Sequence, residues 1–392
     1  MAKIYRAALL GCGSRGGHAS RAYRYHPRTD VVGLCDLDRE RLDALGDELG
    51  VGARFDDIEK MLAAVEPDIV IVPVQTDLHF PLAMRVLAAR SCHLDVEKPM
   101  TVDLAQADAL LARTGELDTQ IAVHHQGSSL RSLRAAKQAL DEGRIGVPLH
   151  VTSNGKGYYG GYEIMNMGTH MLNALLAVTG PCRRVTATLL TNGRPITPED
   201  VVQSPSGMGT IAGQQITATL EFDEMLTGTL HQHMFPGIER EALGFEIAGT
   251  EGRLRWHYDG AWILPVPWAV PGRAEWEPLA EQQPPEPLPD GVNDGEYWYV
   301  DDYVNALEAG GSPPNSGHRG RHIIEIILAI FESGAYRRPV PLPQTERDHP
   351  LLRLRHEAGL GDPDPAPRPY REWLAVQAAK HGWPVERTGE LP

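Results

Sequence analysis

The feature of this 392-residue chain that most limits its fold is a glycine-rich turn near the N-terminus. The turn reads Gly11-Cys12-Gly13-Ser14-Arg15-Gly16; it follows an apolar run over residues 4–10 and precedes a helical pattern over residues 17–25. In such a strand–turn–helix unit, the first glycine permits the tight turn, the second lets the backbone approach a pyrophosphate, and the third lets helix and strand pack closely. The helix N-terminus then offers free N–H groups and a positive dipole end. The six residues of the turn are therefore predicted to bind a dinucleotide.

Asp36 extends this prediction to the adenosine ribose. It follows the apolar run over residues 31–35 and stands twenty residues after Gly16. At this spacing an acidic side chain accepts hydrogen bonds from the ribose hydroxyls. Its charge repels a 2′-phosphate, so the sequence favours NAD over NADP. The alternative is that Asp36 only caps the helix that follows it.

The pattern of apolar residues predicts two domains. Over residues 1–125, short apolar runs alternate with amphipathic stretches, which indicates βαβ units and a doubly wound parallel sheet, the Rossmann fold. After about residue 147 the chain reads mainly as strands with turns between them. We expect a mostly antiparallel, open-faced sheet in a substrate-binding and oligomerisation α+β domain over residues 147–340. A helix over residues 129–142 and the C-terminal tail from Pro339 are expected to pack on the first domain.

Composition excludes several classes of partner. The chain has 37 basic and 52 acidic side chains, a net charge of −15, which opposes nucleic-acid binding. No apolar run reaches the length of a membrane span, and the N-terminus lacks a signal-peptide pattern. The four cysteines are far apart and form no CxxC pair. We therefore expect a cytoplasmic protein that acts on a small molecule.

No metal site is expected. His231 and His233 would share one face of a strand, as two ligands require. No nearby Asp, Glu or Cys completes a ligand set, so they are interpreted as polar residues of a sheet face.

A second motif, Val96-Glu97-Lys98-Pro99, stands at the end of another expected strand. A Glu-Lys-Pro sequence after a glycine-rich dinucleotide turn resembles the glucose–fructose oxidoreductase / inositol dehydrogenase / rhizopine-catabolism (Gfo/Idh/MocA) family. Further segments resemble the same family: Thr76-Asp77-Leu78-His79, Gly143-Arg144-Ile145-Gly146, Gly249-Thr250-Glu251-Gly252 and Pro339-Val340-Pro341-Leu342-Pro343. The resemblance runs from about residue 4 to residue 343.

The resemblance implies an enzyme that transfers hydride between NAD(P) and a sugar, cyclitol or glycoside, with Lys98 beside the nicotinamide. It also implies cofactor contacts from the residues that follow the later parallel strands: Val74, Gln75, Thr76, His79, Glu97 and Gln126. Two positions depart from the family pattern. Asn166 stands where the family often has Asp, and Ser128 near a position that is often Arg.

Oxidation of a secondary alcohol requires polar groups within hydrogen-bond reach of its oxygen. Asn166 and His170 are four residues apart in one expected helix over about residues 164–178, so they should share a face. We assign His170 as general base and Lys98 as the donor that stabilises charge on the substrate oxygen. Asn166 should position the substrate or His170. The simpler alternatives are a structural histidine and a surface lysine.

Two more expectations concern the surroundings of this site. Tyr158 and Tyr159 precede the helix and are expected to contact substrate. The Lys98–Pro99 bond is a candidate for the cis isomer, which occurs at X–Pro bonds.

Two other functions fit the same residues. One is a redox-neutral enzyme that holds NAD tightly, oxidises a glycoside transiently and eliminates a substituent. The other is a non-catalytic protein that senses NAD or a sugar. In each case a broad sheet with one uncovered face is expected to expose an apolar patch, which predicts a homodimer or homotetramer through the C-terminal sheet.

Overall fold

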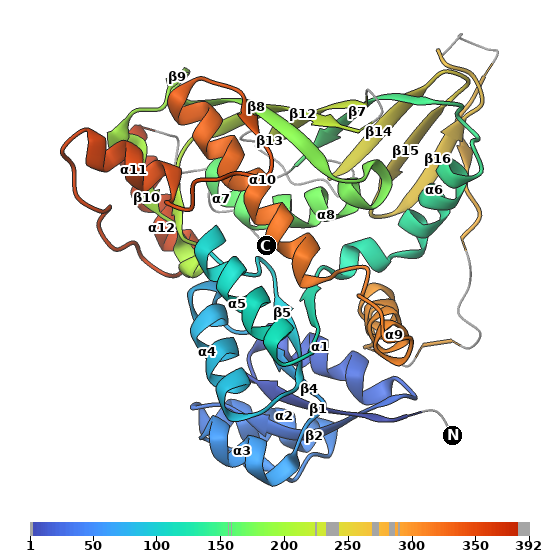
Figure 1. Cartoon of the computed structure of the whole chain (residues 1–392), viewed down its shortest axis with the longest axis vertical. Helices are drawn as coiled ribbons and strands as arrows, with labels where there is room; N and C mark the ends of the chain where they lie inside the picture. Colours follow the sequence, from blue (N-terminus) through green and yellow to red (C-terminus); the bar gives the residue numbers. More distant parts are fainter. Residues whose placement is uncertain are drawn as a thin grey trace. The chain divides into compact units, whose positions relative to one another are not determined.

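The computed structural model describes residues 3–155, 157, 159–223, 226–232, 243–268, 274–281, 287–288 and 291–382. The chain divides into two compact units (Figure 1). Unit 1 comprises Met1–Thr101, Ala105–Arg131 and Gln282–Arg321; unit 2 comprises Val102–Leu104, Ser132–Glu281 and His322–Pro392. Within the described ranges, no helix combines the length and apolar character needed to cross a membrane.

Unit 1 contains a six-stranded parallel sheet in the order β3-β2-β1-β4-β5-β6. Its strands are β1 (Tyr5–Leu10), β2 (Thr29–Cys35), β3 (Arg54–Phe55), β4 (Ile69–Val72), β5 (His93–Glu97) and β6 (Ile121–His124). Its helices are α1 (Ser14–Tyr25), α2 (Arg39–Leu49), α3 (Ile58–Val65), α4 (Thr76–Ala89), α5 (Leu104–Glu116), the 3₁₀ helix η1 (Gln126–Ser129) and α9 (Asp294–Glu308). Apolar side chains of α1, α2 and α9 pack in one core cluster with the sheet, and those of α3, α4 and α5 pack in another. The doubly wound parallel sheet predicted from the sequence is confirmed.

Helix α9 is a correction to the expected domain boundaries. It falls within residues 147–340, which were predicted to form the second domain, but it belongs to unit 1. Tyr299, Val300, Tyr303 and Val304 of α9 are buried in the same cluster as Tyr23 of α1. The apolar stripe of α9 therefore completes the core of the first sheet, although about 160 residues of chain separate it from η1.

Unit 2 is built on a mostly antiparallel sheet in the order β17-β16-β15-β14-β7-β13-β12-β8-β18, with β9 paired to β8. Only the pair β13–β7 is parallel among these described strands. The strands are β7 (Pro148–Asn154), β8 (Cys182–Thr191), β9 (Arg194–Pro195), β12 (Gln215–Phe222), β13 (Thr227–Gln232), β14 (Gly244–Gly249), β15 (Arg253–His257), β16 (Gly260–Leu264), β17 (Glu277–Pro278) and β18 (Val340–Pro341), with a separate pair β10 (Val202–Gln203) and β11 (Thr210–Ile211). The antiparallel character predicted for this part of the chain is confirmed.

The helices of unit 2 are α6 (Arg131–Asp141), α7 (Gly160–Met165), α8 (Met167–Thr179), α10 (Gly317–Tyr336), α11 (Pro350–Glu357) and α12 (Tyr370–His381), with the 3₁₀ helices η2 (Pro198–Asp200) and η3 (Pro205–Gly207). Helix α10 begins at the end of unit 1 and continues into unit 2. Helix α7 contacts β12 and β13, and Figure 1 shows α7 and α8 along one side of these strands.

The other face of this sheet carries threonines, and the expected apolar patch is not there. Thr217 lies opposite Thr188, and Thr219 lies between Thr186 and Thr229 on the neighbouring strands. All five are exposed or half-buried. Of the large exposed apolar side chains in the described residues, only Leu149 lies on a strand of the sheet. The alternation places polar, β-branched residues outward, so the expectation of an apolar face is wrong.

Two further segments lie elsewhere than predicted. Helix α6, expected to pack on the first domain, belongs to unit 2 from Ser132 onward, where Ser132 accepts a hydrogen bond from Trp256 Nε1 at 3.0 Å. The C-terminal segment also belongs to unit 2, where Trp373 of α12 is fully buried and donates to the carbonyl of Gln203 at 2.9 Å. Each segment belongs to the unit in which its buried aromatic contact lies. A local sequence pattern does not show which unit that is.

Candidate active site

The glycine-rich turn lies between β1 and α1, at the carboxyl edge of the unit 1 sheet. Gly11 has a φ of +101°, a conformation that favours glycine. A Cβ on Gly16 would stand 2.1 Å from the carbonyl oxygen of Gly11, so a side chain there cannot fit. A Cβ on Gly13 would meet nothing within 4 Å. The turn thus combines one close-packed position with one open position, as the approach of a pyrophosphate requires.

Helix α1 begins without a side-chain cap. Its N-cap residue is Gly13, which has no side chain to cap the helix, and the first turn contains no acidic residue. The N-terminus of a helix carries roughly half a positive elementary charge together with unpaired N–H groups. This helix end is therefore suited to a phosphate group.

Asp36 stands beside the turn, directly after β2. Its Oδ2 accepts a hydrogen bond from the N–H of Cys12 at 2.6 Å, and its Oδ1 accepts one from the N–H of Asp38 at 2.8 Å. Each carboxylate oxygen can accept a further hydrogen bond. Burial and the charge of Asp36 raise the pKa of the Cys12 thiol to about 12, so the thiol is neutral at ordinary pH. The residues of this edge fit a dinucleotide, with Asp36 placed for the ribose.

The loop after β4 is tied to the loop after β5 by His79. Val74 packs on the turn, since its Cγ1 lies 3.0 Å from the Cβ position of Gly11. Gln75 is the N-cap residue of α4, and Thr76 is its first residue. The His79 ring is fully buried, with one nitrogen 3.0 Å from the Val74 carbonyl and the other 2.9 Å from the Pro99 carbonyl.

Burial lowers the pKa of His79, although hydrogen bonds to backbone carbonyls oppose this shift. The neutral ring has one N–H to donate, and both nitrogens face backbone. This geometry favours a role in holding the two loops together over direct contact with a cofactor.

The Glu-Lys-Pro motif forms the end of β5 and the turn after it. Glu97 is buried, Lys98 is half-buried, and the Lys98–Pro99 bond is cis, as predicted. The guanidinium of Arg15 donates to Glu97 at 3.1 Å and to Glu296 at 3.2 Å. Because the Arg15 side chain binds two carboxylates, we expect Arg15 to contact a phosphate through its backbone N–H.

Gln126 follows β6 at the same edge of the sheet, in η1. Its Oε1 is buried and has no hydrogen-bond partner among the described residues. A buried oxygen without a donor costs about 1–3 kcal/mol, and a donor on a bound molecule would remove that cost. This observation also fits a cofactor at the carboxyl edge.

Three buried residues near this motif were not predicted from the sequence: Glu296, Asp95 and His124. His124 contacts the carboxylates of Asp95 and Glu296, and Glu296 also contacts Arg15. Glu296 lies 281 residues after Arg15, so no local pattern connects the two. The strand alternation that places Asp95 on the same face as Glu97 was the only available signal.

In unit 2 the helix expected over residues 164–178 is interrupted. Asn166 ends α7 and begins α8, with φ −93° and ψ −88°, outside the helical range. Asn166 and His170 therefore do not share one continuous helix, and the i, i+4 argument for their pairing is wrong. Asn is a residue that often stands at helix ends, because its short polar side chain suits a non-helical position. His170 is buried in α8, and Asn166 is half-buried.

Of the two tyrosines expected at the substrate, Tyr158 lies outside the described residues. Tyr159 is fully buried, with its ring edge-on to Trp373 at 5.0 Å between centroids. Burial raises the pKa of its hydroxyl above the usual value. This placement supports a packing role for Tyr159.

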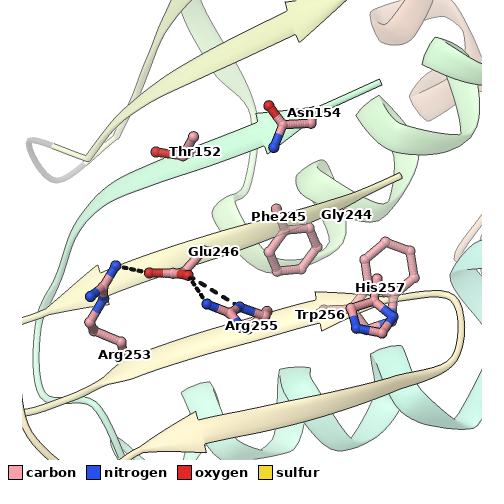
Figure 2. Close-up of a pocket in the computed structure, with 9 residues that line it drawn as sticks. All are labelled: Thr152, Asn154, Gly244, Phe245, Glu246, Arg253, Arg255, Trp256 and His257. Carbon is pink, nitrogen blue, oxygen red and sulfur yellow. Dashed lines mark hydrogen bonds and ion pairs between the residues drawn. The ribbon is translucent and has the colours of Figure 1, made fainter. Parts of the chain in front are cut away.

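A hollow of about 380 Å³ in unit 2 includes none of the predicted site residues. Figure 2 shows Glu246 of β14 between Arg253 and Arg255 of β15, with both guanidinium groups directed at its carboxylate. This is a cross-strand ion-pair group on the sheet. His233, the second histidine considered as a metal ligand, lies outside the described residues. In the part of the chain that the structure describes, no group of three His, Cys, Asp or Glu side chains could hold a metal ion.

The structure thus brings the glycine-rich turn, Asp36, Val74, Glu97 and Gln126 to the carboxyl edge of one sheet. Lys98 stands at that edge in unit 1, while Asn166 and His170 lie in unit 2. A parallel sheet with this strand order, glycine turn and acidic residue defines a dinucleotide-binding Rossmann domain.

Comparison with known proteins agrees with that class. Residues 5–125 match the model of the oxidoreductase family with an NAD-binding Rossmann fold, and residues 133–255 match the Gfo/Idh/MocA C-terminal domain. The chain belongs to the Gfo/Idh/MocA family and is an NAD-binding oxidoreductase.

Individual relatives are distant. D-apiose dehydrogenase of Paraburkholderia graminis is 25% identical over 380 residues, which cover 89% of this chain and 93% of that protein. D-glucoside 3-dehydrogenase of Escherichia coli is 27% identical over 191 residues, 45% of this chain and 54% of that protein. A solved structure of levoglucosan dehydrogenase with NADH and levoglucosan has a TM-score of 0.70 at 17% identity, covering 87% of this chain and 100% of that one, which shows a common fold.

Proposed function

We propose that this protein is an NAD-dependent dehydrogenase that oxidises a secondary hydroxyl of a sugar, a cyclitol or a glycoside. The proposal depends on one observation: the open glycine turn, Asp36 and Lys98 follow β1, β2 and β5 and so lie at the same carboxyl edge of the unit 1 sheet. The names of the D-apiose, D-glucoside and levoglucosan dehydrogenases support the class of substrate.

The proposed chemistry divides between two side chains. Alcohol oxidation breaks an O–H and a C–H bond, and the C–H electron pair leaves with the hydrogen as hydride. Bound NAD supplies the hydride acceptor. His170 takes the hydroxyl proton as general base, and Lys98 donates a hydrogen bond to the oxygen as negative charge develops there. In reduction His170 returns the proton. Asn166 does not accept a proton at ordinary pH, so its proposed role is to position His170 or the substrate.

The proposed cofactor preference is NAD over NADP. Two backbone N–H groups fix the orientation of the Asp36 carboxylate beside the turn. Ribose hydroxyls can donate to this carboxylate, whereas a 2′-phosphate would bring like charges together.

The proposed setting is a cytoplasmic homodimer or homotetramer that binds a small molecule. The four cysteines are buried and free, which suits a reducing compartment. The proposed contact between copies is the threonine-rich face of the unit 2 sheet.

A screen of sugars, cyclitols and glycosides tests this function. The full-length protein is assayed with NAD and with NADP, and NADH absorbance is followed together with the mass of the product. Accumulating NADH with an oxidised sugar is the expected result. Product formation without net NADH would instead favour the redox-neutral reaction, and equal rates with NADP would contradict the role of Asp36.

Substitution of Lys98 and His170 tests the proposed chemistry. Lys98→Ala and His170→Ala are each expected to lower kcat by about 10²–10⁴-fold, because each removes a group from the reacting oxygen. For His170→Ala the Kd for NAD should change little, since His170 lies outside the NAD-binding unit.

Lys137→Ala and His356→Ala serve as controls, because both side chains are exposed and make surface ion pairs. They should retain the kcat of the parent protein. Near-parental turnover by Lys98→Ala or His170→Ala on the true substrate would refute the assignment.

A further inference from the structure

Five titratable side chains form a continuous, mostly buried path of contacts in unit 1. His124 Nδ1 contacts Asp95 at 3.0 Å, and His124 Nε2 contacts Glu296. Glu296 accepts from Arg15 at 3.2 Å, and Arg15 donates to Glu97 at 3.1 Å. The path begins and ends on β5 and passes through β6, α9 and α1. We call these five residues the buried charge cluster.

Four of the five side chains in the cluster are buried, and Arg15 is half-buried. Asp95 is 0% exposed, and its two oxygens also accept from the hydroxyls of Tyr23 at 2.9 Å and Tyr299 at 2.7 Å. His124 and Glu296 are 1% and 2% exposed. Taking charges out of water is costly, and replacing a buried ion pair by apolar residues is often neutral or stabilising. Stability alone therefore does not account for the cluster.

The cluster carries an excess of negative charge. Three carboxylates face one guanidinium and one imidazole, so the sum is −1 with His124 protonated and −2 with it neutral. Burial lowers the pKa of His124, but Asp95 and Glu296 outweigh burial and raise it well above its usual value. Burial raises the pKa of Glu296, but His124 and Arg15 reverse this and lower it to about 2. The sum stays negative in either state of His124.

We propose that the buried charge cluster makes the protein prefer the oxidised over the reduced form of its cofactor, with Glu296 and Arg15 acting as positioning residues. The inference rests on the proposed place of Lys98 beside the nicotinamide, because Glu97 of the cluster directly precedes Lys98. The nicotinamide of NAD⁺ is a cation and that of NADH is neutral, while the rest of the two molecules is the same. A buried negative charge therefore stabilises NAD⁺ selectively and partly offsets the positive charge of Lys98.

The ratio of the two dissociation constants, Kd(NAD⁺)/Kd(NADH), measures this preference. NAD⁺ and NADH share the same phosphates and riboses, so a substitution that affects the binding of these groups changes both dissociation constants equally and cancels in the ratio. In the full-length protein, Glu296→Gln keeps the shape and removes one negative charge, so the ratio should rise about three- to tenfold. Arg15→Gln removes a positive charge, and the ratio should fall. Both constants are measured by calorimetric titration.

Asp294→Asn is the matched control. Asp294 lies on the same helix, pairs with Arg131 at 2.9 Å and is partly exposed, so water screens its charge. The ratio should stay unchanged in this variant. Thermal unfolding shows whether each variant is folded. If Glu296→Gln does not fold, Glu97→Gln is used in its place, and it is also expected to raise the ratio.

The outcomes separate this inference from the proposed function. The inference is overturned if the ratio is unchanged in variants that still bind both cofactor forms. An equal rise of Kd(NAD⁺) and Kd(NADH) leaves the ratio unchanged and is what a purely structural role would give. Failure of the parent protein to bind either form would instead contradict the proposed dehydrogenase.

Discussion

Single glycines of the turn allow cofactor binding to be separated from folding. In Gly13→Ala the new Cβ enters open space, so the melting temperature should stay within about 2 °C while the Kd for NAD rises at least tenfold. In Gly16→Ala the Cβ collides with the Gly11 carbonyl, so the backbone must shift and the melting temperature should fall. Thermal unfolding and NAD titration of both variants check this.

Gly115→Ala is the control for these substitutions, because Gly115 lies in α5 with nothing near its Cβ position. It should leave the Kd for NAD unchanged and should not lower the melting temperature, because Ala favours a helix more than Gly does. Normal NAD binding by Gly13→Ala would show that the open side of the turn is not where the cofactor approaches.

Helix α12 illustrates how one element depends on a few aromatic contacts. Trp373 is its fully buried anchor, edge-on to Tyr159 and hydrogen-bonded to Gln203. Trp373→Ala should lower the free energy of unfolding by about 3–5 kcal/mol, because it leaves a cavity and an unpaired carbonyl. Urea denaturation of the full chain measures the change.

Trp268 offers a matched comparison, since it is 69% exposed. Trp268→Ala should leave the urea midpoint unchanged. Equal stability of Trp373→Ala and the parent protein would mean that α12 contributes little to unit 2.

For the molecule as a whole, the threonine face of unit 2 determines the proposed association between copies. Thr217 and Thr229 lie on neighbouring strands of that face. Replacing both with Glu would place charges in a closely packed contact, so the molar mass from light scattering should fall to that of a monomer. A parent protein that is monomeric at all concentrations would contradict the proposed oligomer, and Lys137→Glu on α6 controls for added negative charge.

Local patterns in the sequence were sufficient for the parallel sheet, the glycine turn and the place of Asp36. Each of these depends on contiguous residues: a period of apolar side chains, a conformation that glycine allows, and a fixed number of residues from the turn to the next strand. The same patterns identified the antiparallel character of unit 2 through strand alternation.

Only the tertiary structure placed α9 in unit 1, paired Arg15 with Glu296, interrupted the helix at Asn166 and covered Tyr159 with Trp373. A periodic pattern shows which face of a helix or strand is apolar, but not which partner covers that face. Pairing between residues hundreds of positions apart depends on how complete surfaces fit together. That fit arises when the chain packs, and it has no local signature in the sequence.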